Sequence, residues 1–250
     1  LGYNLRDSLL QDKRVRLAVG YAIDQQAIVR YLRRGLATPA IGIVPPMSWA
    51  HDPTVFRFER DVERAKALLD AAGYPDPDGD GPVPRLRLSL KTSTSAAYRL
   101  QAAVIQQNLA EAGIALELRS YEFATLFADV IRGNVQLYTL QWVGVTDPDM
   151  LRRVFHSSQI PPGGFNRGYY SNPDVDRLID QATAALDEDQ RGALYGEAQR
   201  LIAADAPYIS LWYKTNVAVA HERLTGITLS PIADFSFLQH VGSSHELPRS

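Results

Sequence analysis

Apolar side chains recur at helical spacing through the first part of the chain. The stripe within residues 13–23 repeats every three or four positions, which predicts an amphipathic helix, and a second helix follows the capping residue Asp24. A third stripe begins after Asp61 and ends at Gly73. The interval of residues 38–53 is rich in proline, which removes the donors that a strand ladder needs, so we predict loop there.

The middle of the chain combines strand and helix periodicity. Leucines alternate with polar residues over 86–90, residues 95–112 have helical spacing, and alternation returns over 114–118. Such a strand–helix–strand unit predicts two parallel strands with a right-handed crossover. A helix over 123–131 follows, and the nearly continuous apolar run of residues 135–143 is typical of a central strand buried on both faces.

Proline and capping residues mark the helices of the last hundred residues. Pro148 and Pro173 each stand where the first helical residue is expected, and Asp187 with Gln190 forms a capping-box pattern for a helix through Ala204. These elements together predict an α/β architecture. The remaining strand-like segments are residues 208–213, 217–220 and 227–229.

Composition narrows the function classes. The 250 residues include 26 Lys and Arg against 28 Asp and Glu, for a net charge of −2, and 46% are hydrophobic. This balance excludes general disorder and disfavours nucleic acid as a partner, since nucleic-acid binding needs clustered positive charge. The chain has no cysteine, which excludes disulfides, thiolate catalysis and cysteine-ligated metal sites.

Local catalytic motifs are absent. The sequence has no G-x-S-x-G elbow, no phosphate-binding G-x-x-x-x-G-K-[ST] loop and no G-x-G-x-x-G turn, and its five histidines lack helical ligand spacing. We therefore predict a protein that is not an enzyme. A hydrolytic site assembled from distant residues stays open as an alternative.

One acidic turn has metal-like spacing. Asp76, Asp78, Asp80 and Gly81 match the first half of a calcium-binding loop, in which alternate carboxylates converge on the ion. The second half fails, because Arg87 stands where the final Glu is expected. We interpret the segment as an acidic turn and no cofactor is expected, with calcium at Asp76–Gly81 as the alternative.

A group of arginines lies on the first two predicted helices. We interpret this group as a solvated helix face, with contact to an anionic partner as the alternative. The arginines are Arg14, Arg16, Arg30, Arg33 and Arg34.

Trp142 precedes a loop that leaves the carboxyl end of the apolar strand. In open α/β sheets ligands bind at this edge, so the indole is equally compatible with a core position and with a ligand-contacting wall.

A series of short motifs occurs in order along residues 4–215, and together they are similar to the signature of family 5 extracellular solute-binding proteins, the peptide- and nickel-type receptors of ABC importers. The motifs are Asn4 with Asp12–Ala18 and Ala22–Asp24; Gly35–Ala40 with Pro45 and Pro46; Ala65–Gly73; Trp142 with Asp147–Asp149; Tyr170–Pro173; and Asp176, Arg191, Tyr195, Gln199 and Ala206–Tyr208.

The resemblance implies a periplasmic-binding-protein-like fold of two lobes around a cleft. Residues 1–214 would form the second lobe, with a mixed sheet flanked by helices, and residues 215–250 would return to the first lobe. The start at Leu1 agrees with a chain cut from a longer exported one. The upstream part would then build most of the first lobe and carry the export signal and any lipid anchor.

The function implied is capture of a small solute by lobe closure and its delivery to the transmembrane subunits of an ABC permease. The receptor would be a monomer in the periplasm or outside the cell, touching the membrane only through an anchor beyond this chain. A ligand-sensing domain of the same fold in a transcriptional regulator is the second alternative.

The resemblance also implies candidate ligand contacts. In peptide-binding members an Asp three residues after the strand tryptophan pairs with the ligand's α-ammonium, whereas this chain has Val145, and Thr139 replaces an Arg used by oligopeptide members. This departure leaves a modified peptide, an opine-like compound, a sugar or a metal chelate open as cargo. The expected ligand-binding residues are Tyr21, Thr139, Gln141, Trp142, Val145, Thr146, Asp147, Asn166 and Tyr170.

Overall fold

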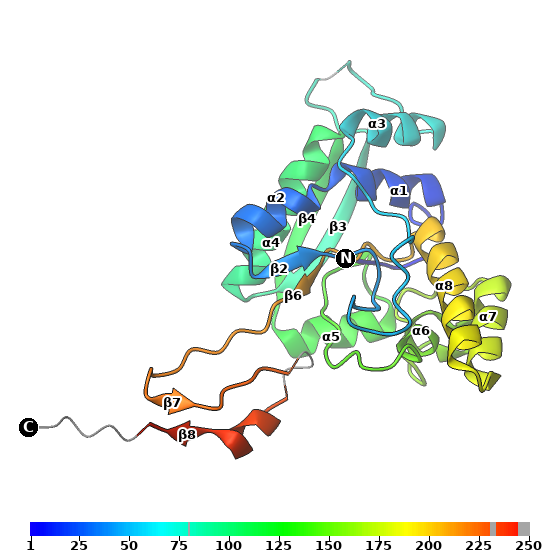
Figure 1. Cartoon of the computed structure of the whole chain (residues 1–250). Helices are drawn as coiled ribbons and strands as arrows, with labels where there is room; N and C mark the ends of the chain where they lie inside the picture. Colours follow the sequence, from blue (N-terminus) through cyan, green and yellow to red (C-terminus); the bar gives the residue numbers. More distant parts are fainter. Residues whose placement is uncertain (80, 231–233, 245–250) are drawn as a thin grey trace, which may run out of the picture.

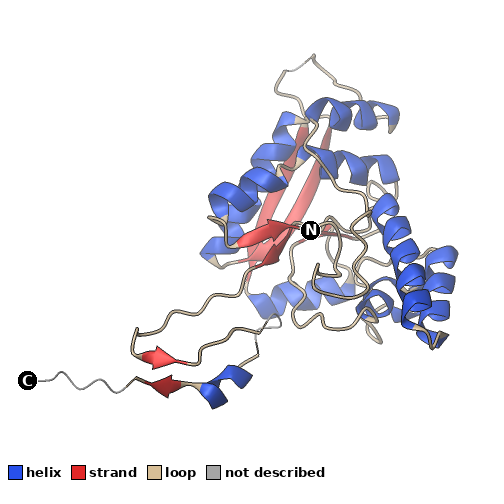
Figure 2. Ribbon diagram, viewed as in Figure 1, coloured by secondary structure: helices blue, strands red, loops and turns tan. Residues whose placement is uncertain are grey.

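A mixed four-stranded sheet organises the larger part of the molecule (Figures 1 and 2). The computed structural model describes residues 1–79, 81–230 and 234–244. Strands β3 and β4 are parallel, β3 and β5 are parallel, and β1 runs antiparallel to β5, which confirms the predicted α/β class with a mixed sheet. In spatial order the strands are β1 (Gly2–Tyr3), β5 (Leu137–Tyr138), β3 (Leu86–Ser93) and β4 (Ile114–Tyr121).

The predicted strand–helix–strand unit is present as β3, α4 (Ala96–Glu111) and β4. Alternate leucines of β3 are buried, and α4 covers the sheet with Ile105 and Leu109, which are fully buried. Local periodicity predicts this unit well because each element buries one regular face.

Aspartates cap the first helices as expected. The carboxylate of Asp12 accepts from the Arg14 amide at 2.8 Å, and that of Asp24 accepts from the Ala27 amide at 2.8 Å. Asp61 caps the next helix in the same way. The helices of this part are α1 (Lys13–Ala22), α2 (Gln25–Ala27), which continues as a π-helix over Ile28–Leu32, and α3 (Val62–Ala71).

A second hydrophobic core lies among the later helices, seen in yellow and green at the right of Figure 1. Asn172 and Asp187 cap α7 and α8 through side-chain oxygens, as the sequence predicts. Tyr195 of α8 is fully buried within this core. Its helices are α6 (Met150–Phe155), a 3-10 turn over Ser157–Gln159, α7 (Pro173–Ala184) and α8 (Glu188–Asp205), while α5 (Phe123–Arg132) packs beside the sheet.

Four strand predictions are wrong, two in extent and two altogether. The apolar run 135–143 forms only the two residues of β5, because the chain leaves the sheet and Val143 is 70% exposed. Residues 217–220 and 227–229 form no strand. Residues 208–213 are strand only from Trp212 onward.

The proline-rich interval predicted as loop begins with a strand. β2 (Ala37–Pro39) pairs antiparallel with β6 (Trp212–Lys214), with Thr38 opposite Tyr213. Proline is tolerated at Pro39 because this two-stranded ribbon needs no donor on its free edge.

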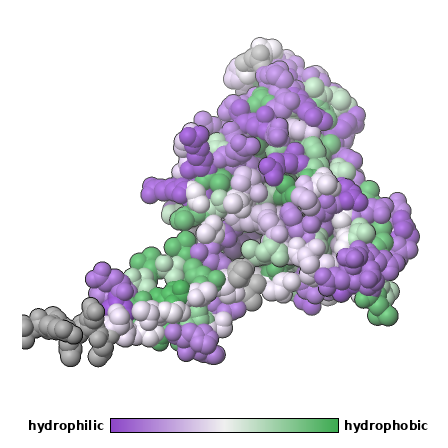
Figure 3. All heavy atoms as spheres, viewed as in Figure 1, coloured by the Kyte–Doolittle hydropathy of each residue, from purple (hydrophilic) through white to green (hydrophobic). Residues whose placement is uncertain are grey.

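Beyond β6 the chain leaves the globular part as an extended arm, here called the C-terminal arm, residues 215–230 and 234–244 (Figure 1). It contains the paired strands β7 (Leu224–Thr225) and β8 (Gly242–Ser243) and a 3-10 turn over Ser236–His240. Figure 3 shows apolar surface gathered on the arm. Val219 and Phe235 are 96% and 74% exposed.

Candidate ligand-binding site

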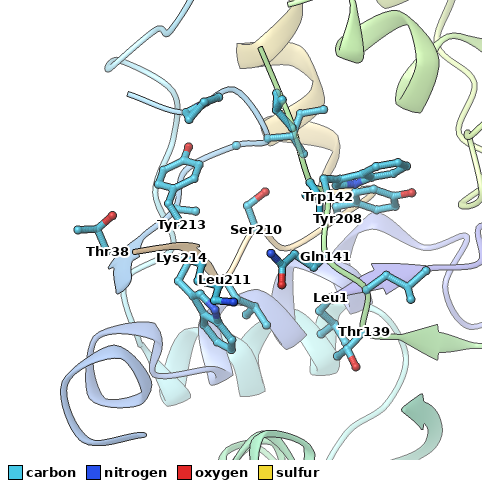
Figure 4. A pocket seen from close by; sticks show the side chains of 18 of the residues that line it. Leu1, Thr38, Thr139, Gln141, Trp142, Tyr208, Ser210, Leu211, Tyr213 and Lys214 are labelled. Carbon is cyan, nitrogen blue, oxygen red and sulfur yellow. The ribbon is translucent and has the colours of Figure 1, made fainter. Parts of the chain in front are cut away.

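A hollow of about 1000 Å³ lies where the sheet, the β2–β6 ribbon and the chain after β5 meet (Figure 4). We call this cavity the central hollow. Most of its wall comes from residues 38–47, 138–145 and 208–216. In Figure 4 the ribbon side carries Tyr213 and Lys214, the opposite side carries Trp142, and the amide of Gln141 points between them.

Trp142 forms part of an aromatic cluster around a buried cation. The guanidinium carbon of Arg167 lies 4.6 Å from the centroid of Trp142, 4.8 Å from that of Phe127 and 5.4 Å from that of Phe165. Burial lowers the pKa of Arg167 below its ordinary value. Arg167 and Trp142 also line a smaller hollow of about 290 Å³, so this cluster separates two spaces.

Arg33 forms a second cationic wall. Its guanidinium carbon lies 4.3 Å above the ring of Trp212, and Nη2 donates a 2.8 Å hydrogen bond to Gln101. Burial lowers the pKa of this arginine as well, and its Nε is buried without a hydrogen-bond acceptor.

Two tyrosine hydroxyls meet at the base of the central hollow. The hydroxyl of Tyr138 donates to that of Tyr208 at 2.9 Å, and burial raises the pKa of both phenols. Nearby, Thr139 and Thr92 share a hydrogen bond of 3.1 Å between their buried hydroxyls. The base therefore presents neutral polar groups.

The structure brings four of the predicted site residues together in the wall of the central hollow. They are Thr139, Gln141, Trp142 and Val145, which all follow β5. Trp142 lines this space and also packs on the second core. Its position therefore fits both a core residue and a residue of the cavity wall.

Five predicted site residues lie outside that wall, and their role in binding stays a prediction. Thr146 and Asp147 are exposed in the loop beyond it, and Asp147 accepts from the Asp149 amide at 2.8 Å. Tyr21 packs edge-to-face on Phe58. The other two are Asn166 and Tyr170.

Asn166 and Tyr170 bond to each other. Asn166 Nδ2 donates to the Tyr170 carbonyl at 2.7 Å, and its Oδ1 accepts from the Tyr170 amide at 3.0 Å. Both side chains are buried and hold the loop before α7 in place.

The arginine group on the first helices is not a uniform solvated face. Arg16 is buried and donates to main-chain carbonyl oxygens of Leu10 at 2.8 Å and Asp205 at 2.6 Å. Arg33 lines the central hollow. Helical spacing missed both, because Asp205 beside Arg16 and Trp212 beside Arg33 come from distant parts of the chain.

Sequence reasoning also missed Arg167 and Tyr208. The one signal available for Arg167 was its place next to Asn166 in an aromatic-rich segment. Phe127 and Trp142 come from separate segments, so no local pattern indicates the whole cluster.

The acidic turn is closed by its own hydrogen bonds. Asp76 Oδ1 accepts from the amides of Asp78 and Gly79 at 3.1 and 2.8 Å, and Oδ2 lies 3.4 Å from Arg85. Asp80 lies outside the described residues, so the calcium alternative stays a prediction. Within the described residues no three metal-binding side chains gather, and no helix is long and apolar enough to cross a membrane.

Comparison with known families decides the chain's identity. The model of the bacterial extracellular solute-binding proteins, family 5 (middle part), matches residues 1–162. The chain belongs to this family. Membership confirms the resemblance seen in the sequence motifs.

Two curated proteins resemble the chain over nearly its whole length. It is 30% identical over 236 residues to a probable di/tripeptide-binding protein 5 of Pseudomonas aeruginosa, covering 93% of this chain and 44% of the relative. It is 33% identical over 244 residues to the glutathione-binding protein GsiB of Salmonella choleraesuis, covering 95% and 46%. The chain thus spans less than half the length of these relatives.

A solved structure of an oligopeptide-binding protein shares the fold. The oligopeptide-binding protein AppA from Bacillus subtilis, solved with a nonapeptide, superposes with a TM-score of 0.84 at 28% identity, covering 97% of this chain and 50% of that one. This agreement confirms the periplasmic-binding-protein-like architecture.

Proposed function

We propose that this chain is the ligand-binding part of the substrate-binding component of an ABC importer, and that the central hollow captures the solute. The observation that carries the proposal is the large cavity lined by residues 138–145 and 208–216, in a chain that belongs to the solute-binding family. A space of about 1000 Å³ suits a small ligand. The proposal includes no catalytic step.

The solute class we propose is small and peptide-like. The relatives carry names for di/tripeptide and glutathione binding, and AppA was solved with a nonapeptide, which supports this class. Val145 and Thr139 supply no charge to the wall, so capture of a free peptide N-terminus by an aspartate is not part of the proposal.

The proposed mechanism is closure of two lobes over the bound solute. Residues 1–214 form one lobe, and residues 215–250 pack on the other. The apolar side chains exposed on the C-terminal arm support this division, since exposed apolar surface marks an interaction site. A ligand that contacts both lobes stabilises the closed state and shifts the population towards it.

The proposed setting is the periplasm or the outer face of the cell, where a monomeric receptor delivers its solute to the permease. A solved structure at 26% identity, the ABC transporter-associated periplasmic binding protein DppA from Helicobacter pylori, supports this location.

Native mass spectrometry tests the proposal. The protein is expressed from its full gene, and its mass is measured before and after mild unfolding. A small solute released on unfolding, and taken up again by the refolded protein, supports the proposal. A refolded protein that binds neither that solute nor a panel of di- and tripeptides contradicts it. Turnover of such peptides would favour a hydrolase instead.

A further inference from the structure

The central hollow carries positive charge without any opposing acid. Arg33, Arg167 and Lys214 line it, and none of its described lining residues is Asp, Glu or His. The smaller hollow shares Arg167 and likewise has no acidic residue in its described lining. A concave wall with one sign of charge concentrates ligands of the opposite sign.

Arg167 has no ionic or hydrogen-bonding partner for its guanidinium among the described residues, although the residue is only 7% exposed. Buried arginines are normally paired, as Arg85 is here with Asp70 and Asp76. A guanidinium carries five N–H donors and no acceptor, so its hydrogen-bonding capacity is left to whatever enters the hollow.

The aromatic rings around Arg167 do not replace such a partner. Trp142, Phe127 and Phe165 attract the cation through their ring faces, which offsets part of the cost of burial. A ring face accepts no ordinary hydrogen bond from the in-plane donors. The cluster therefore fixes the position of the guanidinium and leaves its donors available to the space that it lines.

Arg33 and Lys214 extend the same pattern to the ribbon side. Among the described residues, the guanidinium of Arg33 bonds to the neutral amide of Gln101 and is in no ion pair with a carboxylate. Lys214 is exposed and is in no ion pair within the described part of the chain. The charged side chains among the described lining residues are thus two arginines and a lysine.

We propose that the solute is an anion and that one of its carboxylate groups binds the guanidinium of Arg167. A carboxylate offers two acceptor oxygens in the plane that a guanidinium fork prefers, and burial beside Trp142 strengthens the pairing. A cationic ligand would meet only like charge in this wall. The inference rests on the proposed solute-binding function and names its substrate class.

A matched series of tripeptides isolates the charge. N-acetyl-trialanine carries only the carboxylate, trialanine carries both end charges, and trialanine amide carries only the ammonium. Glutathione adds a ligand with two carboxylates. Calorimetry is run on the protein expressed from its full gene, at pH 7 and low salt. We expect the acetylated peptide and glutathione to bind and the amide not to bind.

Two substitutions assign the effect to Arg167. R167M should weaken binding of N-acetyl-trialanine by roughly tenfold to a hundredfold, the range for a hydrogen bond to a charged group, and R167K should weaken it less. R153M removes an exposed positive charge outside the hollow and should leave affinity unchanged. Thermal unfolding of each variant shows that loss of binding is not loss of fold.

The outcomes distinguish failure of the anionic solute class from failure of the solute-binding function. Equal affinity for trialanine amide and N-acetyl-trialanine would overturn the anionic class, and no loss in folded R167M would overturn the assignment of the carboxylate to Arg167. Either result would leave the receptor function standing. A co-purified solute without an acidic group would likewise overturn the anionic class. Binding of none of the four ligands, with no solute released from the purified protein, would overturn both.

Discussion

The hydroxyl of Tyr170 donates a 2.7 Å hydrogen bond to the carboxylate of Asp205, and so joins the loop before α7 to the end of α8. Asn172 donates to the same carboxylate oxygen at 2.8 Å, and Lys13 lies 3.4 Å from the other oxygen. One carboxylate thus connects three separate segments. This arrangement points to a structural role for a tyrosine that sequence motifs assign to the ligand.

Tyr170→Phe should therefore lower the free energy of unfolding by about 1.5–3 kcal/mol, the usual value for a hydrogen bond to a charged group. Solute affinity should not change. Urea denaturation and calorimetry measure the two quantities. Weaker solute binding with unchanged stability would instead support the sequence-based assignment of Tyr170 to the ligand site.

The same carboxylate predicts an acid-sensitive stability. Burial opposes ionisation of Asp205, but the hydrogen bonds from Tyr170 and Asn172 and the charge of Lys13 outweigh it and lower its pKa. A lowered pKa in the folded state stabilises the protein above the unfolded pKa of about 3.9, and this contribution is lost as pH falls through the folded value. Asp205→Asn should make the free energy of unfolding fall less steeply at acidic pH. The same steepness in the variant and the natural protein would contradict the role given to Asp205.

Trp142 should report solute binding by fluorescence. Trp142 and Trp212 line the central hollow, whereas Trp49 packs against Tyr195 in the second core. Solute binding should change the emission, and Trp142→Phe should reduce that change to the part that Trp212 contributes. Trp49→Phe is the matched control and should keep it. A signal lost with Trp49 and kept without Trp142 would place binding elsewhere.

Helix α4 offers a matched pair for the core. Leu109 is fully buried against the sheet, whereas Leu100 on the same helix is 54% exposed. Leu109→Ala should lower the free energy of unfolding by about 2–5 kcal/mol, because it leaves a cavity. Leu100→Ala should change it by less than about 1 kcal/mol. Similar losses for the two variants in denaturant titrations would argue against this packing.

Calcium should not stabilise the acidic turn. Asp76 already accepts hydrogen bonds from two main-chain amides and faces Arg85, so an ion would have to displace these interactions. We expect the same Tm with millimolar calcium and with a chelator. A rise in Tm with calcium that Asp76→Ala abolishes would show that the calcium alternative is correct.

Sequence predicted the parts of the fold that rest on local repetition. The alternating leucines of β3 and the capping aspartates Asp12, Asp24 and Asp61 each act within a few residues of their partners, so the pattern alone locates them. The apolar run around β5 misled, because apolar residues that line a hollow have the same composition as a buried strand. Val143 lines the central hollow and is exposed.

The sequence predicts the part of the candidate site that follows β5 but not the cluster around Arg167. Residues 139–145 follow one another in sequence, and the rule that ligands bind beyond the carboxyl ends of strands finds them. Arg167 gains its environment from Phe127 and Trp142, which approach it only in the folded chain. Cation–aromatic clusters of this kind have no spacing rule, so only the folded arrangement identifies them.

The β2–β6 ribbon is the junction between the globular part and the C-terminal arm. Three residue pairs, from Ala37 with Lys214 to Pro39 with Trp212, hold the start of the arm against the rest of the molecule. Because Trp212 of this ribbon stacks on Arg33 in the wall of the central hollow, the junction is itself part of that wall. A solute that displaced either side chain would therefore act on the point from which the arm extends.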